Sequence, residues 1–283
     1  MNDFQRSSYH LLQVRGKTID YSRKTAIMGI LNVTPDSFSD GGKFNQLDQA
    51  VQHALEMERQ GADIIDIGGE STRPGYQPVS VQEEISRVVP MIRAIREASD
   101  IPISIDTYKA ETACRALEAG ADIINDVWGA KADPDMAHIA AEYGAPIILM
   151  HNRKNNHYRH LIEDMKADLR VSIHLVRDAG VLPEKIILDP GIGFAKDYQQ
   201  NLAVMNHLEA FHDLGYPLLL GTSRKGFIGR TLNVTVDQRI EGTGATVCLG
   251  ITKGCQIMRV HDVDAIAKMA KMMDAMLQEK CND

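Results

Sequence analysis

Short apolar runs alternate with longer amphipathic segments along most of the chain. Eight of these runs have the length and composition of buried β-strands, namely residues 26–33, 62–69, 101–107, 121–127, 145–151, 185–191, 217–223 and 255–261. Apolar residues recur at helical spacing over residues 47–61, 81–99, 110–120, 136–144, 202–215 and 262–277. Four of the first five helical segments end on glycine, a common helix terminator. This order of elements predicts an α/β fold, a single (β/α)8 TIM barrel.

The apolar runs are nearly continuous, which is typical of parallel strands that are buried on both faces. An open, doubly wound sheet is the alternative, because the order of elements does not show whether the sheet closes. Upstream, residues 10–22 predict a β-hairpin that turns at Gly16 and Lys17 and covers the bottom of the barrel. No linker divides the chain. We therefore expect one domain over residues 1–283, with the hairpin in 1–25 and the barrel in 26–280.

One pentapeptide, GADII, occurs at residues 61–65 and again at 120–124, with the variant GAPII at 144–148. We interpret it as a repeated joint, in which Gly ends a helix, the next two residues turn the chain and the isoleucines enter the barrel wall. The first copy continues into DIGGESTRPG and the second into NDVWG. A shared beginning with different polar endings suggests that the functional residues stand at the ends of the strands.

Polar residues stand at the carboxyl end of nearly every predicted strand, which is where (β/α)8 barrels carry their active sites. Side-chain alternation puts Arg259 and His261 on one face of their strand, and it puts Asp189 on the same face as Ile187 and Asp106 on the same face as Ser104. The strand-end residues are Asn32, Asp66, Gly68, Gly69, Asp106, Asn125, Asp126, Met150, His151, Asp189, Ser223, Lys225, Arg259 and His261. We expect these side chains to point into the mouth of the barrel, the opening at the carboxyl ends of its strands.

Each of these residues also has a simpler interpretation. Asp106 or Asp126 could cap the following helix, and His151 or His261 could be buried histidines that are satisfied by hydrogen bonds. Lys225 could be a solvated loop lysine, and the stretch DPGIGF lacks the pattern of a nucleotide-binding loop. So many polar strand ends on one rim nevertheless favour a functional site.

Composition narrows the class of function. The 283 residues are 44% hydrophobic, enough for a large core, and the formal net charge is −7, which gives no general attraction to nucleic acid or to an anionic membrane. No apolar run approaches the length of a membrane span, and the polar N-terminus lacks a signal-peptide core. Cys114, Cys248, Cys255 and Cys281 lie far apart without metal-binding spacing, so we expect reduced thiols and a cytoplasmic protein.

Two long loops rich in Gly, Ser and Asp follow the first two strands, with the sequences NVTPDSFSDGGKF and GGESTRPGYQPVS. We expect them to act as lids that exclude water once substrate is bound. Plain surface loops are the alternative.

Several sequence blocks together resemble the dihydropteroate synthase family: GILNVTPDSFSDGG, GADIIDIGGESTRPG, IDTYKA, INDVWG, LMH, DPGIGFAK, SRKGFIG and RVHDV. They occur in this order between about residues 26 and 263, and the first two are the most specific. The resemblance implies a TIM barrel, which agrees with the strand count. It also implies a transferase of folate biosynthesis, a target of sulfonamides, that joins p-aminobenzoate to 6-hydroxymethyl-7,8-dihydropterin diphosphate. Mg²⁺ and a homodimer are implied as well.

The resemblance further implies roles for individual residues. The pterin would contact Asp106, Asn125, Met150, Asp189, Gly221, Lys225 and Arg259, of which Asp106, Asp189, Lys225 and Arg259 would be catalytic. The diphosphate would meet Asn32, Arg259 and His261, with Asn32 also a ligand of Mg²⁺. p-Aminobenzoate would lie among Phe38, Ser39, Thr72, Arg73, Pro74 and Phe194. The serine that many family members carry after the SRK lysine is Gly226 here, so the p-aminobenzoate carboxylate would need another donor.

For the reaction itself, we expect diphosphate to leave before the amine attacks, because an electron-rich dihydropterin can spread the resulting positive charge. Asp106 and Asp189 would stabilise that cation, and Mg²⁺, Arg259 and His261 the departing diphosphate. Closing of the lids over bound pterin would make substrate binding ordered. Three alternatives remain from sequence: a methyltetrahydrofolate–corrinoid methyltransferase, a non-catalytic pterin-binding barrel, and a Schiff-base aldolase that uses Lys225.

Overall fold

The computed structural model describes residues 9–33, 43–70 and 78–279. Within these residues, eight parallel strands form one sheet in the order β8-β7-β6-β5-β4-β3-β10-β9. The strands are β3 (Ala26–Asn32), β4 (Ile64–Gly68), β5 (Ile103–Asp106), β6 (Ile123–Asp126), β7 (Ile147–Met150), β8 (Ile186–Asp189), β9 (Leu219–Leu220) and β10 (Ile257–Val260). All eight predicted strands are present, each shorter than its apolar run by one to five residues.

The sheet closes on itself between its first and last strands. Leu188 at the end of β8 forms a parallel bridge with Leu218, and the backbone N–H of Leu188 donates to the carbonyl of Pro217 at 2.9 Å. The fold is therefore a (β/α)8 barrel, and the alternative of an open sheet is wrong.

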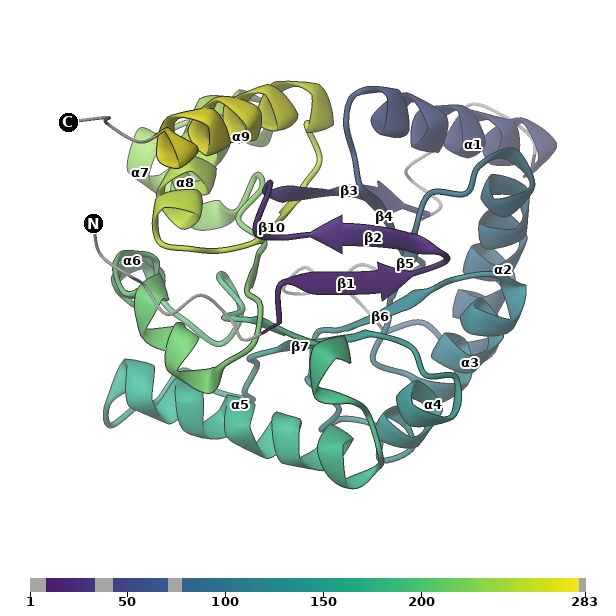
Figure 1. Ribbon diagram of the computed structural model, residues 1–283, viewed down its shortest axis with the longest axis horizontal. Helices are drawn as coiled ribbons and strands as arrows, with labels where there is room; N and C mark the ends of the chain where they lie inside the picture. Colours follow the sequence, from purple (N-terminus) through teal and green to yellow (C-terminus); the bar gives the residue numbers. More distant parts are fainter. Residues whose placement is uncertain (1–8, 34–42, 71–77, 280–283) are drawn as a thin grey trace.

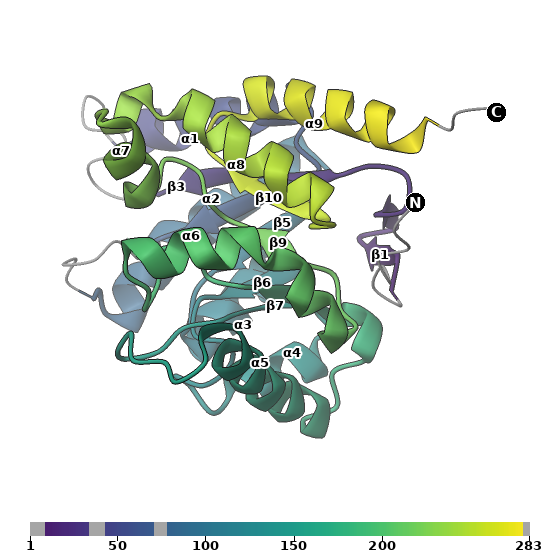
Figure 2. The same ribbon diagram turned by 90° about the vertical axis from the view of Figure 1, so that its left-hand side faces the viewer.

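Helices surround the barrel in a ring (Figure 1), and the side view shows helices above and below the strands (Figure 2). They are α1 (Lys43–Arg59), α2 (Val81–Ala98), α3 (Ala110–Ala119), α4 (Met136–Glu142), α5 (Leu161–Asp178), α6 (Tyr198–Asn206), α7 (Gly226–Leu232), α8 (Ile240–Thr252) and α9 (Val263–Gln278). The segment 202–215, predicted as one helix, is split into α6 and a 3-10 helix, η3 (Leu208–Leu214), whose Leu208 and Phe211 are both buried. Their i, i+3 spacing suits a turn of three residues.

Helix α5 was not predicted, although the sequence carries a signal for it. Its buried residues Met165, Leu169, Ile173 and Val176 recur every three or four positions, as on one face of a helix. The segment directly before it, residues 152–160, is polar and shows no helical periodicity.

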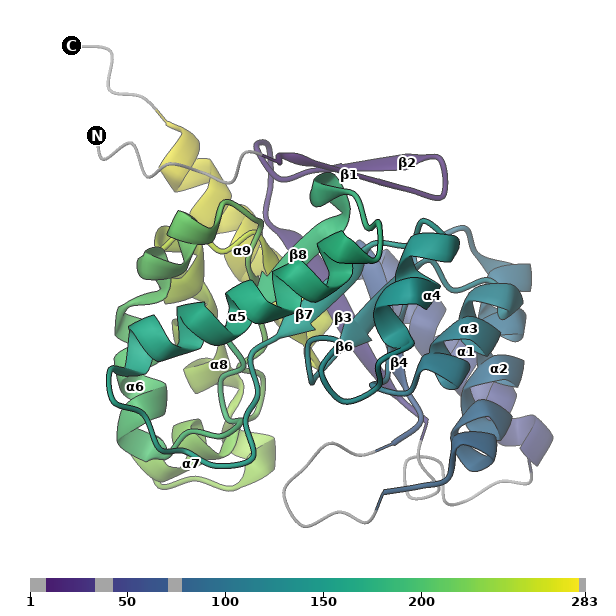
Figure 3. The same cartoon turned by 90° about the horizontal axis from the view of Figure 1, so that it is seen from below.

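The N-terminal segment forms the predicted hairpin from β1 (Leu11–Val14) and β2 (Lys17–Asp20). Val14 pairs with Lys17, so the two turn residues are Arg15 and Gly16, one position earlier than predicted. Both have positive φ angles, 49° and 67°, as a tight hairpin turn of the primed type requires. Figure 1 shows the hairpin in front of the ring of helices, and Figure 3 shows it at one end of the barrel with α7 toward the other.

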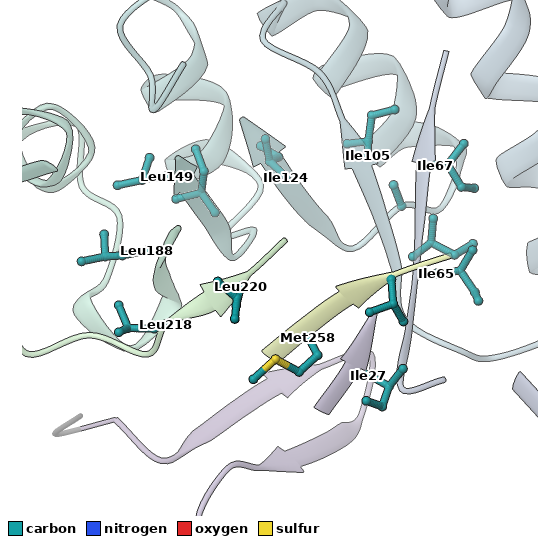
Figure 4. Packing of buried hydrophobic residues seen from close by; sticks show 14 of the residues in the cluster. Ile27, Ile65, Ile67, Ile105, Ile124, Leu149, Leu188, Leu218, Leu220 and Met258 are labelled. Atoms are coloured by element: carbon teal, nitrogen blue, oxygen red, sulfur yellow. The ribbon is translucent and has the colours of Figure 1, made fainter. Parts of the chain in front are cut away.

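The hairpin plugs the amino-terminal end of the barrel. Leu12, Val14, Ile19 and Tyr21 share one buried cluster with inward residues of seven strands, among them Met28, Ile64, Ile123, Ile148, Ile187, Leu219 and Ile257. Outward residues of the barrel strands, such as Ile65, Ile105, Ile124, Leu149 and Met258, pack against the helices instead (Figure 4). The amino-terminal half of the barrel wall is thus apolar on both faces of the sheet. Polar groups that could bind a ligand inside the barrel therefore lie at its carboxyl end.

The repeated GADII segments are the joints that the sequence predicts, and their aspartates add an interaction. Gly61 and Gly120 have φ angles of 106° and 114°, which glycine adopts readily. The Asp63 carboxylate accepts a hydrogen bond from the backbone N–H of Ile27 at 3.0 Å. Asp122 accepts from the N–H of Ile103 at 2.9 Å. The aspartate of each repeat therefore forms a hydrogen bond with the start of the strand that precedes its own strand in the barrel.

The three cysteines that lie within the described residues, Cys114, Cys248 and Cys255, are free thiols, as expected. Cys281 lies outside the described residues. Among the described helices, none has both the length and the apolar character needed to cross a membrane.

Candidate active site

The upper layer of the barrel interior is polar. Along each strand the inward positions alternate, so the residue two positions beyond a buried apolar residue also points inward. Asp66 follows Ile64, Asn125 follows Ile123, Met150 follows Ile148, Asp189 follows Ile187 and Arg259 follows Ile257. Gly221 follows Leu219 in the same way, and Ser104 and Asp106 are the inward residues of β5. Seven of the eight strands thus contribute to one ring above the apolar plug.

Arg259 links the carboxylates of this ring. Its Nε donates to Asp66 Oδ2 at 2.6 Å and its Nη2 donates to Asp106 Oδ2 at 2.6 Å. The amide of Asn125 donates to the same Asp66 oxygen at 3.2 Å. Asp66 is fully buried, so it fixes both the guanidinium and the amide from below.

Buried oxygen atoms in this layer retain capacity to accept hydrogen bonds. Among the side chains of the described residues, Asp66 Oδ1, Ser104 Oγ and Asp106 Oδ1 are buried without a hydrogen-bond partner. Such groups are uncommon in folded proteins and are explained most simply by a polar ligand or by water. Their position in the mouth favours a ligand with N–H groups.

Burial controls the protonation of the two carboxyl groups that were predicted to be catalytic. It raises the pKa of Asp106, and the nearby Arg259 partly offsets this effect while Asp66 adds to it. Burial also raises the pKa of Asp189, against the influence of Lys225. In both cases the negative charge is costly in the closed barrel, so a cation placed beside it would be strongly favoured.

Lys225 lies beside Asp189 and is enclosed by the loop that follows β8. Its ammonium donates to the carbonyl of Ile192 and lies 4.5 Å from the centre of the Phe194 ring. Burial lowers the pKa of Lys225 to about 8, although Asp189 acts in the opposite direction. The loop carboxyl-terminal to β8 therefore supplies both an oxygen and an aromatic face to this lysine.

His261 is held at the end of β10 by Ser223. The Ser223 hydroxyl oxygen accepts from the backbone N–H of His261 at 3.1 Å and lies 2.9 Å from its Nδ1. Arg224, between Ser223 and Lys225, has a positive φ of 58° and donates from Nε to Asp262 at 2.9 Å. These contacts join the loop after β9 to the loop after β10.

Two glycines, Gly68 and Gly221, lie among the polar groups of the mouth. A Cβ on Gly68 would lie 3.7 Å from Asp106 Oδ2 and 3.9 Å from Asn32 Oδ1, so Gly68 stands between these side chains. A Cβ on Gly221 would lie 3.9 Å from both Asp189 Oδ2 and Arg259 Cβ. A Cβ at either position would make ordinary van der Waals contact with these side chains, so each glycine leaves the polar atoms uncovered by a side chain of its own.

Comparison with known proteins places the chain in a family. The sequence model of the family described as pterin binding enzyme matches residues 28–261. Dihydropteroate synthase of Bacillus subtilis is 61% identical over 269 residues, which is 95% of this chain and 94% of that protein. Dihydropteroate synthase of Clostridium beijerinckii is 59% identical over 94% of this chain and the whole of that protein. The chain belongs to the pterin-binding enzyme family.

Solved structures of pterin-binding enzymes agree with this assignment. One is the dihydropteroate synthase of Clostridium difficile, determined in the presence of pteroic acid. It has a TM-score of 0.90 and 52% identity, and the match covers 92% of this chain and 100% of that one. The enzyme of Xanthomonas albilineans, determined with 4-aminobenzoic acid, has a TM-score of 0.91 at 36% identity and covers 96% of this chain and 100% of its own.

For a pterin-binding enzyme, most of the predicted substrate-binding residues gather in one place. Asn125, Met150, Asp189, Gly221, Lys225, Arg259 and Asp106 line the upper barrel, and Asn32, His261 and Phe194 stand on its rim. Phe38, Ser39, Thr72, Arg73 and Pro74 lie outside the described residues. The sequence places Asp66 at a strand end, and its alternation with the buried Ile64 is the signal that this side chain points inward.

Two neighbouring residues have structural roles: His151 has the one considered for it, and Asp126 is a cap of the turn after β6 instead of the predicted cap of the following helix. Asp126 accepts from the backbone N–H groups of Trp128 and Ala130, both at 2.7 Å, so it caps the turn after β6 and does not enter the mouth. His151 is fully buried and its Nε2 lies 3.0 Å from Asp168 Oδ2. It is a buried histidine satisfied by hydrogen bonds, at the edge of the site.

Proposed function

We infer that this pterin-binding enzyme is a dihydropteroate synthase. It condenses 6-hydroxymethyl-7,8-dihydropterin diphosphate with p-aminobenzoate to give 7,8-dihydropteroate and diphosphate. The observation that carries the inference is the ring of Asp66, Asp106, Asn125, Asp189 and Arg259 in one barrel mouth. Its combination of buried acceptors and a planar cation matches both ends of the pterin diphosphate.

The pterin ring presents adjacent N–H donors and one carbonyl acceptor along a flat edge. We propose that Asp189 accepts from the 2-amino and N3 hydrogens, which makes a paired, charge-assisted contact. Asn125 would donate and accept at neighbouring ring positions, and Lys225 would donate to the carbonyl or a ring nitrogen. Asp106 has an unpaired oxygen that would accept from the N–H of the reduced ring. Arg259 and Met150 would lie against the two ring faces.

In the proposed reaction, the bond between the pterin methylene carbon and the diphosphate oxygen breaks first. Positive charge then spreads into the dihydropterin ring, where the carboxylates of Asp106 and Asp189 stabilise it. Because burial makes both negative charges costly in the free enzyme, a cation that forms beside them is favoured before any rearrangement. Arg259 and His261 would hold the departing diphosphate. The amine of p-aminobenzoate then attacks the carbon and loses one proton.

Asn32 is the residue that we propose for Mg²⁺. Its amide oxygen stands at the rim beside Gly68 and Asp106 and is exposed. The described residues contain no cluster of three or more histidines, cysteines or carboxylates suited to a metal. A single oxygen ligand still fits Mg²⁺, because this ion usually keeps several waters and takes its other ligands from substrate phosphates. When bound, it would supply positive charge to the diphosphate oxygens.

The second substrate would bind next to Phe194. We propose that p-aminobenzoate packs on this ring after the pterin has bound. Equilibrium binding of p-aminobenzoate with and without pterin diphosphate tests this order, and equal affinity in both cases would contradict it. The homodimer, the cytoplasmic location and inhibition by sulfonamides likewise stay predictions.

A turnover assay with the two substrates and Mg²⁺ tests the function directly. Wild type should release diphosphate, and Asp189→Ala should lose about a hundredfold or more in kcat/KM, because one preorganised contact to the developing charge is removed. Undiminished activity of Asp189→Ala would overturn the site assignment. Tight pterin binding without turnover would favour a non-catalytic barrel. Methyl transfer from methyltetrahydrofolate, or borohydride trapping at Lys225, would favour the other two alternatives.

A further inference from the structure

The residues that follow β8 form a short turn, residues 191–194, against the side chain of Lys225. The carbonyl of Ile192 accepts from the Lys225 ammonium, and the Phe194 ring lies 4.5 Å from it. Between them, a Cβ on Gly193 would lie only 2.9 Å from Lys225 Cδ, so this glycine is also in close contact. The position of the Lys225 side chain therefore depends on the position of this turn.

Lys196 holds the same turn from the other side. Its ammonium donates to the carbonyl of Gly191 and to that of Phe194, both at 2.9 Å, and so binds both ends of the turn. Its third contact is to Nδ1 of His151 at 3.0 Å. One side chain thus connects the turn to the end of β7.

His151 is in turn held firmly. Its ring Nε2 lies 3.0 Å from Asp168 on α5, and its backbone N–H donates to the carbonyl of Asp189 at 2.8 Å. An ionised Asp168 requires a hydrogen on Nε2, so Nδ1 of the neutral ring is an acceptor. Burial lowers the pKa of His151 to about 4, which agrees with a neutral ring that accepts a hydrogen bond from charged Lys196.

We propose that Lys196 is a positioning residue for Lys225, holding residues 191–194 against His151 so that the Ile192 carbonyl and the Phe194 ring keep the Lys225 ammonium beside Asp189. The inference rests on the proposed function, because Lys225 acts on the pterin only in that reaction. Lys196 bonds the backbone carbonyl of Phe194, whereas p-aminobenzoate is assigned to the ring of that residue. Its effect on the reaction passes through the turn.

The arrangement needs the proton that lies between Lys196 and His151. Charged Lys196 has three hydrogens for three acceptors, whereas the neutral amine has two and would turn a lone pair toward that of Nδ1. The charged groups that face Lys196 are Asp189, Lys225, Arg153 and Asp168, beside the titratable His151. Burial together with Lys225 and Arg153 lowers the pKa of Lys196 to about 7, against the two aspartates. The hydrogen bonds of Lys196 to residues 191–194 and to His151 should therefore weaken as the pH rises through about 7.

Lys196→Met is the first test, with Lys166→Met as the matched control. Lys166 is a buried lysine on α5 that pairs with Glu163 and Asp213 at 3.0 and 2.9 Å, away from the barrel mouth. We expect Lys196→Met to lower kcat/KM for pterin diphosphate between tenfold and about a hundredfold, the scale of a small misplacement of a catalytic group. Lys166→Met should leave kcat/KM within about twofold of wild type and affect only the melting temperature.

Coupling to Lys225 separates positioning from general stabilisation. If Lys196 acts through Lys225, adding Lys196→Met to the Lys225→Met variant should lower kcat/KM and pterin diphosphate affinity only slightly further. Lys196→Arg keeps a permanent charge, so it should recover part of the rate. It should also move the alkaline decline of kcat/KM to higher pH, toward the value of about 8 expected for Lys225.

Each outcome decides a different question. A wild type without turnover would remove the proposed function. Normal turnover together with a Lys196→Met variant like the Lys166 control would remove the role of Lys196, and so would fully additive losses in the double variant. An alkaline limb that is identical in wild type and Lys196→Arg would show that the proton between Lys196 and His151 is not required.

Discussion

At the scale of single residues, position along a strand decides between function and structure. Asp106 and Asp126 both end a strand and both have a raised pKa because of burial. Asp106 lies at an inward position and contacts Arg259, whereas Asp126 lies one position beyond the inward Asn125 and bonds the backbone of its own turn. Alternation was available in the sequence, so this distinction could have been drawn from it.

Gly226 gives a prediction at this scale, because it replaces a serine expected from the family resemblance. A Cβ added here would meet no atom within 4 Å, so a side chain fits without displacement. We expect Gly226→Ser to lower the KM for p-aminobenzoate several-fold, since the hydroxyl offers the carboxylate about one net hydrogen bond. The KM for pterin diphosphate should stay unchanged.

Steady-state kinetics with each substrate varied in turn measures the effect. Gly215→Ser would be an unsuitable control, because its φ of 82° makes any side chain strained. Gly226→Ala is the better match, as it adds the same Cβ without the hydroxyl. Equal KM values in the Ser and Ala variants would mean that the carboxylate lies elsewhere.

At the scale of elements, buried ion pairs join helices to the strand ends. Lys109, at the start of α3, donates to Glu70 after β4 at 2.6 Å and to the carbonyl of Val79 before α2 at 2.8 Å. It also pairs with Glu84 of α2 at 2.9 Å. Both carboxylates are nearly buried, with side-chain exposures of 9% and 2%. One ammonium from the β5–α3 unit therefore balances two buried charges of the preceding β4–α2 unit.

Lys109→Met should lower the free energy of unfolding by about 3 kcal/mol or more, because it leaves two buried carboxylates without their cation. Urea denaturation measures this loss. Lys268→Met is the control, since Lys268 is 73% exposed and pairs only with Asp264, one turn away on the same helix. That control should change stability by less than about 0.5 kcal/mol. If the two variants unfold alike, the Lys109 cluster does not stabilise the joint.

At the scale of the whole molecule, α8 and α9 differ in what they contact. Glycines of α8 pack inside the chain, whereas α9 exposes methionines to solvent. A Cβ on Gly242 of α8 would lie 2.3 Å from Ile228 of α7, and a Cβ on Gly244 would lie 2.5 Å from Met269 of α9. Both glycines therefore serve packing within the chain. Met272 and Met276 on α9 are 58% and 52% exposed and remain the candidates for contact with a second copy.

The double variant Met272→Glu, Met276→Glu tests the predicted homodimer. If these methionines lie at an interface, two charges per chain would desolvate on association, and the dimer should dissociate into monomers. Light scattering after size-exclusion chromatography gives the molar mass, with the thermal melting curve as a check on folding. A wild type that is monomeric, or a dimer that survives both substitutions, would contradict the prediction.

The sequence by itself determined the kind of fold and most members of the site. Continuous apolar runs and glycine-ended helices specify eight βα units, because strand and helix periods and helix termination are local properties. It also placed Asp106, Asn125, Asp189, Lys225 and Arg259 at strand ends.

Only the tertiary structure decided closure of the barrel, the bridge of Arg259 between Asp66 and Asp106, and the clamp of Lys196 on residues 191–194. Arg259 is 193 positions from Asp66 and 153 from Asp106. Contacts of that separation depend on how eight strands stagger around a common axis, and no local pattern of residues encodes the stagger.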